Sequence, residues 1–259
     1  MARRKPKSSS YRPDPKPLGY AHRVPSAKSI QSQASGHRGA PMRPSEIEAT
    51  TFYRKNMHWA PVRFYMRSVM DAGSMRQGAD MIAAGEIGKE DIVVDVGSGM
   101  GGWLSALAKG VPLATPPTGV ELSPEMREYS KQRLKEDGLE NVRIVAGSAL
   151  DLDQHIEKAT VVNSGWIIKH LTDHEVLTFF KRVLAVLTPG KRFFVCEFGV
   201  ESGALGRFGH GLAQTKHIRN PADLMSLLDA AGFENIEPNE YAQTWWPMGA
   251  ISLSADKPL

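Results

Sequence analysis

Several features are scarce in this sequence. It has a single cysteine, Cys196, which excludes a disulfide within the chain and fits a reducing compartment. No apolar run approaches the roughly 20 residues that span a bilayer, and the N-terminus lacks the pattern of a secretory signal. These absences favour a cytoplasmic protein without membrane contact. The 259 residues suffice for one large domain with a sizeable core.

Acidic residues are nearly missing from the first 44 residues. Ten lysines or arginines accompany one acid, Asp14, so this segment has a formal charge of +9 and leaves −5 for the rest. It is rich in Pro, Ser and Gly and cannot bury enough apolar surface to offset its ordering entropy. We predict a disordered basic tail over 1–44. Three interpretations stay open: a solvated extension, an arm that contacts RNA, a ribosome or a peptide, and an organelle-targeting segment.

The rest of the chain has a regular pattern. Apolar and aromatic residues at helical spacing predict two or three helices up to about residue 88. Short apolar runs, typical of buried strands, then alternate with helices that have recognisable caps, such as Ser123-Pro124, Thr172 with Glu175, and Asn220-Pro221. The expected strands are 91–96, 118–122, 142–147, 159–164, 192–198, and two within 236–255 joined by a Pro-Met-Gly turn. We predict a doubly wound, mainly parallel α/β sheet with an antiparallel C-terminal edge.

The first of these strands leads into a glycine-rich turn, Gly97-Ser98-Gly99-Met100-Gly101-Gly102. The turn satisfies two patterns: G-x-G-x-x-G of dinucleotide-binding dehydrogenases, and G-x-G-x-G of enzymes that bind S-adenosylmethionine. Glu121 ends the next strand, where a carboxylate can accept hydrogen bonds from the ribose hydroxyls of either cofactor. The glycines and Glu121 do not choose between the two.

Three further features make the choice. Asp95 precedes the first glycine by two residues, the residues after 102 are used in completing one sheet, and a strand pair follows the last helix. With these features and the motifs VVDVGSGMGG, GVELSPEM, VAGSALDL, VVNSGWIIKHLTD, VLTPGKRFFVCEF and LLDAAGFENIE, residues 50–254 resemble the class I S-adenosylmethionine-dependent methyltransferases. The resemblance implies a Rossmann-like fold with a seven-stranded sheet, a helical N-terminal lid over 45–88, and an S-adenosylmethionine-binding domain over 89–259.

The resemblance also implies roles for individual residues. The turn would approach the methionine part of the cofactor, Asp95 its amino group, and Glu121 its ribose. Many members have an acid where this chain has Ser148, so adenine recognition would use backbone groups or the nearby Asp151. Asn163 and Ser164 would lie where cofactor and acceptor meet. The implied cofactor-binding residues are Asp95, Gly97, Ser98, Gly99, Gly101, Glu121, Leu122, Ser148, Ala149 and Asn163.

Candidate catalytic residues follow the fourth and fifth strands. His170 is the first candidate, because its ordinary pKa suits general-base work near neutral pH, although a histidine just before a helix cap needs no catalytic role. Glu197 can accept a hydrogen bond from substrate or pair with a surface base. His170 and His174 are four residues apart, but we expect no zinc site, because the cap at Thr172 and Glu175 explains the segment and no third ligand has suitable spacing. Aromatic candidates for the acceptor pocket are Tyr53, Trp59 and Trp166, with strand packing more probable for Trp245 and Trp246.

Three classes of methyl acceptor remain. The leading interpretation is a small-molecule N, O or C nucleophile, bound in a compact site beneath the lid. The second is a peptide or protein, because FYRKNMHW and NSGWIIKHLTD are loosely similar to the α-N-terminal protein methyltransferases, with Trp166 and His170 at matching places. The segment FGVESGALGRFGHGLAQ, however, lacks the Asn and Asp residues with which that family holds its substrate. The third is a methyltransferase-like protein that the basic tail carries to RNA or a ribosome.

Overall fold

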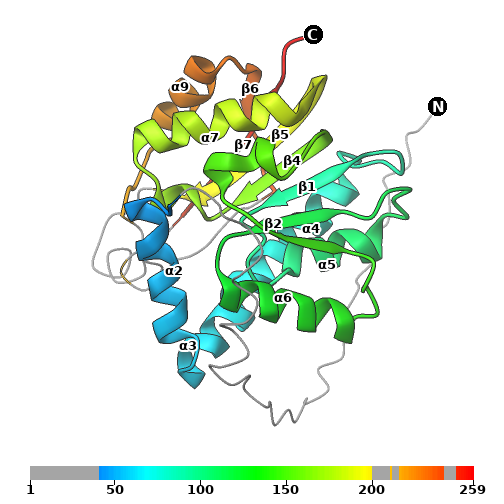
Figure 1. The fold of residues 1–259 in the computed structure, drawn as a ribbon. Coiled ribbons are helices and arrows are strands. Elements are labelled where there is room, and N and C mark those ends of the chain that lie inside the picture. Colours follow the sequence, from blue (N-terminus) through cyan, green and yellow to red (C-terminus); the bar gives the residue numbers. More distant parts are fainter. Residues whose placement is uncertain (1–40, 200–210, 212–215, 242–248) are drawn as a thin grey trace, which may run out of the picture. The chain divides into compact units, whose positions relative to one another are not determined.

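The computed structural model describes residues 41–199, 211, 216–241 and 249–259 (Figure 1). The first 40 residues of the predicted tail, both Trp245 and Trp246, and most of the predicted Pro-Met-Gly turn lie outside the described residues. None of the described helices is long and apolar enough to cross a membrane.

Seven strands of the described chain form a single sheet in the order β3-β2-β1-β4-β5-β7-β6. Pairing is parallel from β3 to β5, whereas β7 pairs antiparallel with both β5 and β6. The prediction of a mainly parallel sheet with an antiparallel C-terminal edge is therefore confirmed. The strands are β1 Val93–Val96, β2 Thr118–Glu121, β3 Arg143–Ala146, β4 Ala159–Gly165, β5 Leu187–Phe198, β6 Glu234–Pro238 and β7 Ala250–Asp256.

Helices cover both faces of the sheet. One face packs against α7 (Asp173–Val186) and α9 (Pro221–Ala231), and the other against α4 (Asp71–Ala83), α5 (Gly102–Gly110) and α6 (Pro124–Glu136) (Figure 1). Neighbouring strand residues enter opposite cores, as side chains that alternate along a strand must. In β5, for example, Phe193 packs in the core beside α7, and Phe194 packs in the core beside α5.

The predicted helix caps are present. The Ser123 hydroxyl accepts a hydrogen bond from the Met126 N–H at 3.3 Å, and Pro124 is the first residue of α6. Capping boxes begin α7 at Thr172 and α9 at Asn220. These caps satisfy N–H groups that have no partner within the helix.

β5 begins earlier than predicted. The Thr-Pro-Gly sequence was expected to turn the chain into a strand at 192, but the strand already starts at Leu187 and contains an irregularity opposite Ala159 and Val161. Gly190 accommodates this irregularity at φ +69°, and its N–H donates to the Lys257 carbonyl at 2.8 Å. Main-chain pairing with the C-terminal segment thus lengthens the strand.

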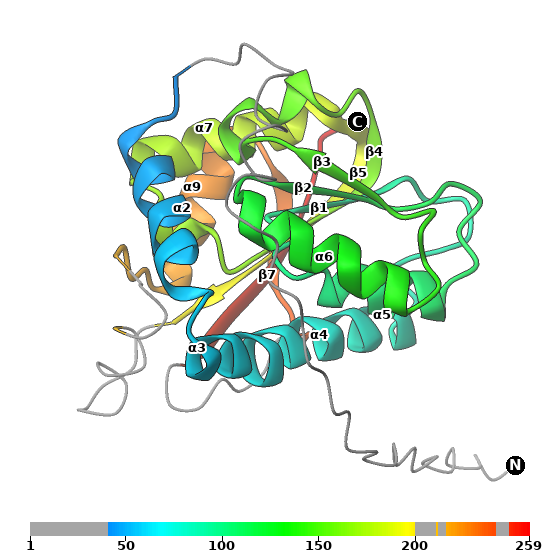
Figure 2. The same cartoon turned by 60° about the horizontal axis from the view of Figure 1, so that its bottom comes forward.

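The N-terminal part of the described chain is helical, as predicted. It contains α2 (Pro44–Asn56), α3 (Ala60–Tyr65), a π-helical turn η1 (Met66–Met70) and α4. Figure 2 shows α4 running beside α5. Helix α2 contacts α6 and η3. Two 3₁₀ segments, η2 (Ala149–Gln154) and η3 (Ile168–His170), follow β3 and β4 at the carboxyl edge of the sheet. Ligands of open α/β sheets bind at this edge.

Candidate functional site

A large pocket opens at the carboxyl edge of the sheet. Its walls enclose about 1170 Å³, including the open mouth, and are formed by the ends of β1 to β4, by η2 and η3, and by α2, η1 and α4. The pocket is lined by most of the predicted site residues: Tyr53, Asp95, Gly97, Ser98, Gly99, Glu121, Leu122, Ser148, Ala149, Asn163, Trp166 and His170.

The glycine turn is held in backbone conformations that other residues rarely adopt. Gly97 and Gly99 have φ values of +74° and +54°. A Cβ at Gly97 would overlap the side chain of Ile167, whereas one at Gly99 would meet nothing closer than the Gly97 carbonyl oxygen at 3.9 Å. Packing against Ile167 thus requires a glycine at position 97, whereas the space beside Gly99 is free for a ligand. Gly101, which we expected at the cofactor, is instead the N-cap of α5 and does not line the pocket.

Glu121 joins the glycine turn to the end of β2. One carboxylate oxygen accepts the Gly99 N–H at 2.8 Å, and the other accepts the Ser123 N–H at 2.8 Å. Burial raises the pKa of Glu121, while these two hydrogen bonds and the charge of Arg127 oppose the rise. Each carboxylate oxygen can accept more than one hydrogen bond. The carboxylate therefore fixes the turn and can still accept hydrogen bonds from a ligand.

Asp95 lies at the end of a chain of buried side chains. The Asn163 amide donates to its carboxylate at 2.8 Å, and Gln77 of α4 donates to the Asn163 oxygen at 3.2 Å. Burial raises the pKa of Asp95 to about 7, with the Asn163 hydrogen bond opposing the rise and the Glu121 charge adding to it. A cationic ligand group would offset the cost of this buried charge. Sequence reasoning missed Gln77, because nothing in its helix distinguishes it from other polar residues.

Lys169 is a further pocket residue that sequence reasoning missed. Its side chain is only 2% exposed, and its ammonium lies 4.7 Å from the centre of the Phe198 ring. Among the described residues its side chain has no hydrogen bond or ion pair. Burial lowers the pKa of Lys169 to about 8, while the charge of Glu197 opposes the fall. A lysine next to a predicted strand is usually at the surface, so its burial could only come from the structure.

His170 lines the pocket beside Lys169. Burial, with the charges of Lys169 and His217, lowers the pKa of His170 to about 3, so the imidazole is neutral at neutral pH. Its Nε2 is buried and has no hydrogen-bond partner among the described residues. His174, in contrast, is exposed on the first turn of α7. The described residues contain no group of three His, Cys, Asp or Glu side chains that could hold a metal ion.

Two other predicted residues do not line the pocket. The carboxylate of Glu197 accepts the backbone N–H groups of Lys169 and Phe198, each at 2.8 Å, so it positions the segment that carries Lys169. The prediction that Glu197 faces substrate or a surface base does not match this buried position. Trp59 is 64% exposed at the start of α3. Trp166 does line the pocket and packs against Phe198 with ring centres 4.6 Å apart.

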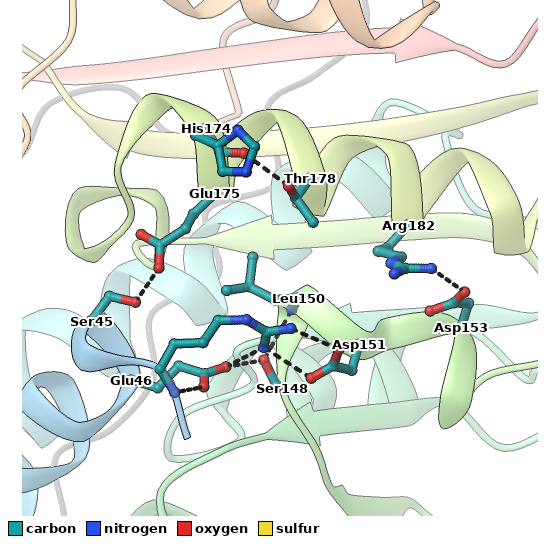
Figure 3. Close-up of polar contacts among 11 residues, drawn as sticks. Ser45, Glu46, Ser148, Leu150, Asp151, Asp153, His174, Glu175, Thr178 and Arg182 are labelled. Carbon is teal, nitrogen blue, oxygen red and sulfur yellow. Dashed lines mark hydrogen bonds and ion pairs between the residues drawn. The ribbon is translucent and has the colours of Figure 1, made fainter. Parts of the chain in front are cut away.

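Hydrogen bonds connect the N-terminus of α2 to the residues that follow β3 and to the start of α7 (Figure 3). Figure 3 shows Ser45 directed toward Glu175 of α7, with a hydrogen bond of 2.6 Å, and Glu46 directed toward Ser148. We call these contacts, together with those of Arg43, the α2 network. Arg43, assigned to the tail by the sequence prediction, binds both oxygens of Asp151 at 2.9 Å. Asp151, one expected partner of adenine, pairs with Arg43 and does not line the pocket.

This chain is similar to methyltransferases both in sequence and in structure. Residues 93–190 match the family model described as a methyltransferase domain. The demethylmenaquinone methyltransferase of Lactococcus lactis is 30% identical over 105 residues, which are 40% of this chain and 41% of that protein. That of Staphylococcus aureus strain MRSA252 is 33% identical over 97 residues, 38% of this chain and 39% of that protein. The chain thus spans about two fifths of the length of these relatives.

Solved structures show the same fold at low identity. Magnesium protoporphyrin IX methyltransferase from Synechocystis PCC 6803 has a TM-score of 0.63 and 14% identity, covering 85% of this chain and all of the other. Phosphoethanolamine N-methyltransferase 2 from Haemonchus contortus has a TM-score of 0.58 and 18% identity, covering 71% of this chain and 52% of the other.

Proposed function

We propose that this chain, a member of the class I S-adenosylmethionine-dependent methyltransferases, uses the pocket at the carboxyl edge of its sheet to methylate a small molecule. The observation that carries the proposal is the position of Glu121. Its buried carboxylate is held by the N–H groups of Gly99 and Ser123 in the wall of a pocket that also contains Asp95. This arrangement supports a site in which an acceptor for ribose hydroxyls lies beside a partner for an ammonium group.

The residues present fit S-adenosylmethionine. Asp95 uses one carboxylate oxygen for Asn163, and the buried Ser98 hydroxyl has no partner among the described residues, so both offer polar atoms to a ligand. We assign the amino group to Asp95, the ribose to Glu121, and the adenine to Leu122, Ser148 and Ala149. When bound, this cofactor supplies a methyl group on a cationic sulfur.

The main task of the protein residues would be to align the acceptor and exclude water. Tyr53 and Trp166 provide aromatic walls at the end of the pocket that contains Lys169 and His170. With a pKa near 3, His170 is a weak base. We assign to its neutral imidazole the orientation of the acceptor through a hydrogen bond, in place of the general-base role considered from the sequence.

The buried position of Lys169 favours a small methyl acceptor that is anionic or neutral. A buried ammonium repels a protonated amine, such as the N-terminus of a peptide, and attracts a carboxylate or an ionised hydroxyl. The curated relatives are named for demethylmenaquinone, a small molecule. The peptide alternative draws on the presence of Trp166 and His170 in the pocket, but it places a cationic substrate near Lys169. The RNA alternative depends on the tail, whose first 40 residues lie outside the described ones.

A labelled-methyl assay tests this proposal. Methyl-labelled S-adenosylmethionine is incubated with the full chain and with separate small-molecule, peptide and RNA fractions of cell extract. We expect label in the small-molecule fraction. With the acceptor in hand, Lys169→Met should raise its KM about tenfold or more, the size of a lost charge-assisted hydrogen bond, and leave cofactor affinity unchanged. The exposed Lys158→Met is the matched control. Label in peptides or RNA instead would contradict the small-molecule assignment.

A further inference from the structure

Helix α2 contributes a buried carboxylate to the pocket. Glu46, on the first turn of α2, is 6% exposed and lines the same pocket as Glu121. One of its carboxylate oxygens accepts hydrogen bonds from the Ser148 hydroxyl and from the Arg43 guanidinium, the latter at 3.3 Å, and the other accepts the Arg43 backbone N–H at 2.7 Å. A carboxylate is placed in a protein interior only at a cost, unless it is hydrogen-bonded. The α2 network therefore holds Glu46 at the pocket wall.

The surroundings of Glu46 define one end of the pocket. Leu122 and Met126 follow β2, and Ala149 and Leu150 follow β3, so apolar side chains form walls that suit a flat ring. The other acid nearby, Asp151, has both oxygens bound to Arg43 and lies outside the pocket wall. Glu46 is therefore the carboxylate that can meet the edge of a ring bound between these walls.

The chemistry of Glu46 selects the type of ring. An ionised carboxylate only accepts hydrogen bonds, so it complements an amino group and repels a carbonyl oxygen at the same place. The oxygen that accepts the Arg43 backbone N–H can accept one further hydrogen bond, because each carboxylate oxygen has two acceptor positions. Glu121 lies between the glycine turn and this end of the pocket, since β2 lies between β1 and β3 in the sheet. A ribose at Glu121 would therefore place its attached base next to Glu46.

We propose that Glu46 binds the amino group of the cofactor's adenine ring, so that a residue of helix α2, outside the sheet domain, determines the choice of base. Arg43 positions Glu46 by direct contact and is itself held by Asp151, while Ser45 fixes the same helix turn through Glu175. This inference rests on the proposed function, because it takes the ligand to be S-adenosylmethionine or its product. It also gives α2 a role beyond covering the acceptor, since closure of α2 and binding of adenine would stabilise each other.

Calorimetry with two ligands tests this role in the full chain. The first is S-adenosylhomocysteine, and the second is S-inosylhomocysteine, in which a carbonyl oxygen replaces the adenine amino group. We expect the wild-type chain to bind the first at least about tenfold more tightly, because the second leaves a buried carboxylate opposite an oxygen. Glu46→Gln should bind both with similar affinity, since an amide can donate to the carbonyl as well as accept from the amine.

Two further variants separate base recognition from other effects. Glu48→Gln removes the same charge from an exposed position on the same helix, where Glu48 pairs with Lys216, and should keep the wild-type preference. Asp151→Asn removes the ion pair that holds Arg43 outside the pocket, while Arg43 keeps its contacts with Glu46, and should weaken both ligands by a similar factor. The thermal unfolding transition of each variant, measured without ligand, shows whether it is folded.

The outcomes are distinct. If Glu46→Gln is folded and keeps the wild-type preference for adenine, the role of Glu46 is wrong and the proposed function stands. A preference equally reduced in Glu48→Gln would also overturn it, because the effect would then come from helix charge. If the wild-type chain binds neither ligand, the proposed function fails and this inference fails with it.

Discussion

At the scale of single residues, the raised pKa of Asp95 leads to a prediction about how ligand affinity depends on pH. The carboxyl group has a pKa of about 7 in the free protein, so most of it is protonated at pH 6. An ammonium ligand favours the ionised form, so affinity for S-adenosylhomocysteine should rise about tenfold from pH 6 to the plateau above pH 7. Calorimetry between pH 5.5 and 8 measures this rise. Asp95→Asn should lack this part of the dependence, and an unchanged pH profile in that variant would disprove the assignment.

Burial of Asp95 has an opposite effect on folding. Because its pKa is raised above the unfolded value, the folded state binds more protons between about pH 4 and pH 7. Ionisation of Asp95 therefore lowers the stability of the free protein as the pH rises through this window. A bound cation at Asp95 reverses that cost, which is consistent with a residue kept for binding rather than for stability.

Residue roles were predictable from the sequence only where a motif fixes the backbone. The glycine turn and Glu121 were located because one strand end and one turn determine their place in the fold. Glu46 and Ser148 are 102 positions apart, and Arg43 and Asp151 are 108 apart. A local sequence pattern cannot predict contacts between residues that are so far apart in the sequence. The burial of Lys169, a residue of η3, depends in the same way on its packing over Phe198 at the end of β5.

At the scale of secondary-structure elements, the cap of α7 should contribute measurably to stability. The Thr172 hydroxyl accepts the Glu175 N–H at 3.3 Å, and the Glu175 side chain also joins α2 through Ser45. Thr172→Ala should lower the free energy of unfolding by about 1 kcal/mol, measured by urea denaturation. Thr178→Ala is the control, because its hydroxyl donates to the His174 carbonyl within the helix, and alanine favours helices. Equal losses in both variants would show that the cap has no special contribution.

The type and order of the helices and strands were predicted better than the residues at which they begin and end. Alternating strands and capped helices determined the sheet type, since buried parallel strands and their crossover helices have distinct sequence patterns. The start of β5 was missed because Thr-Pro-Gly normally favours a turn. Here two main-chain hydrogen bonds override that preference: the Gly190 N–H donates to the Lys257 carbonyl, and the Lys257 N–H donates to the Lys191 carbonyl.

At the scale of the whole molecule, the boundary between tail and folded chain can be tested by truncation. The sequence predicted a tail that ends at residue 44, but Arg43 belongs to the α2 network. A chain that begins at residue 41 should bind S-adenosylhomocysteine as the full chain does. A chain that begins at residue 45 lacks Arg43 and should bind it more weakly, by several-fold to about tenfold, the size of a partly buried charge-assisted contact. Equal affinity of the two truncated chains would contradict the role of Arg43.

The chain that begins at residue 41 also tests whether the basic tail binds RNA. If the chain that begins at residue 41 binds RNA as well as the full chain does, the tail is not an RNA-binding arm. If RNA binding disappears while cofactor binding stays, the tail and the pocket act separately, as the charge of +9 on residues 1–44 and −5 on the remainder suggests.

The central claim is that the pocket binds S-adenosylmethionine through Glu121, and calorimetry with this ligand tests it most directly. We predict binding at a single site by the wild-type chain. Glu121→Gln, which keeps the size of the side chain and removes its charge, should reduce the affinity by about tenfold or more. Absence of binding by the wild-type chain, or undiminished affinity in the folded variant, would contradict the account.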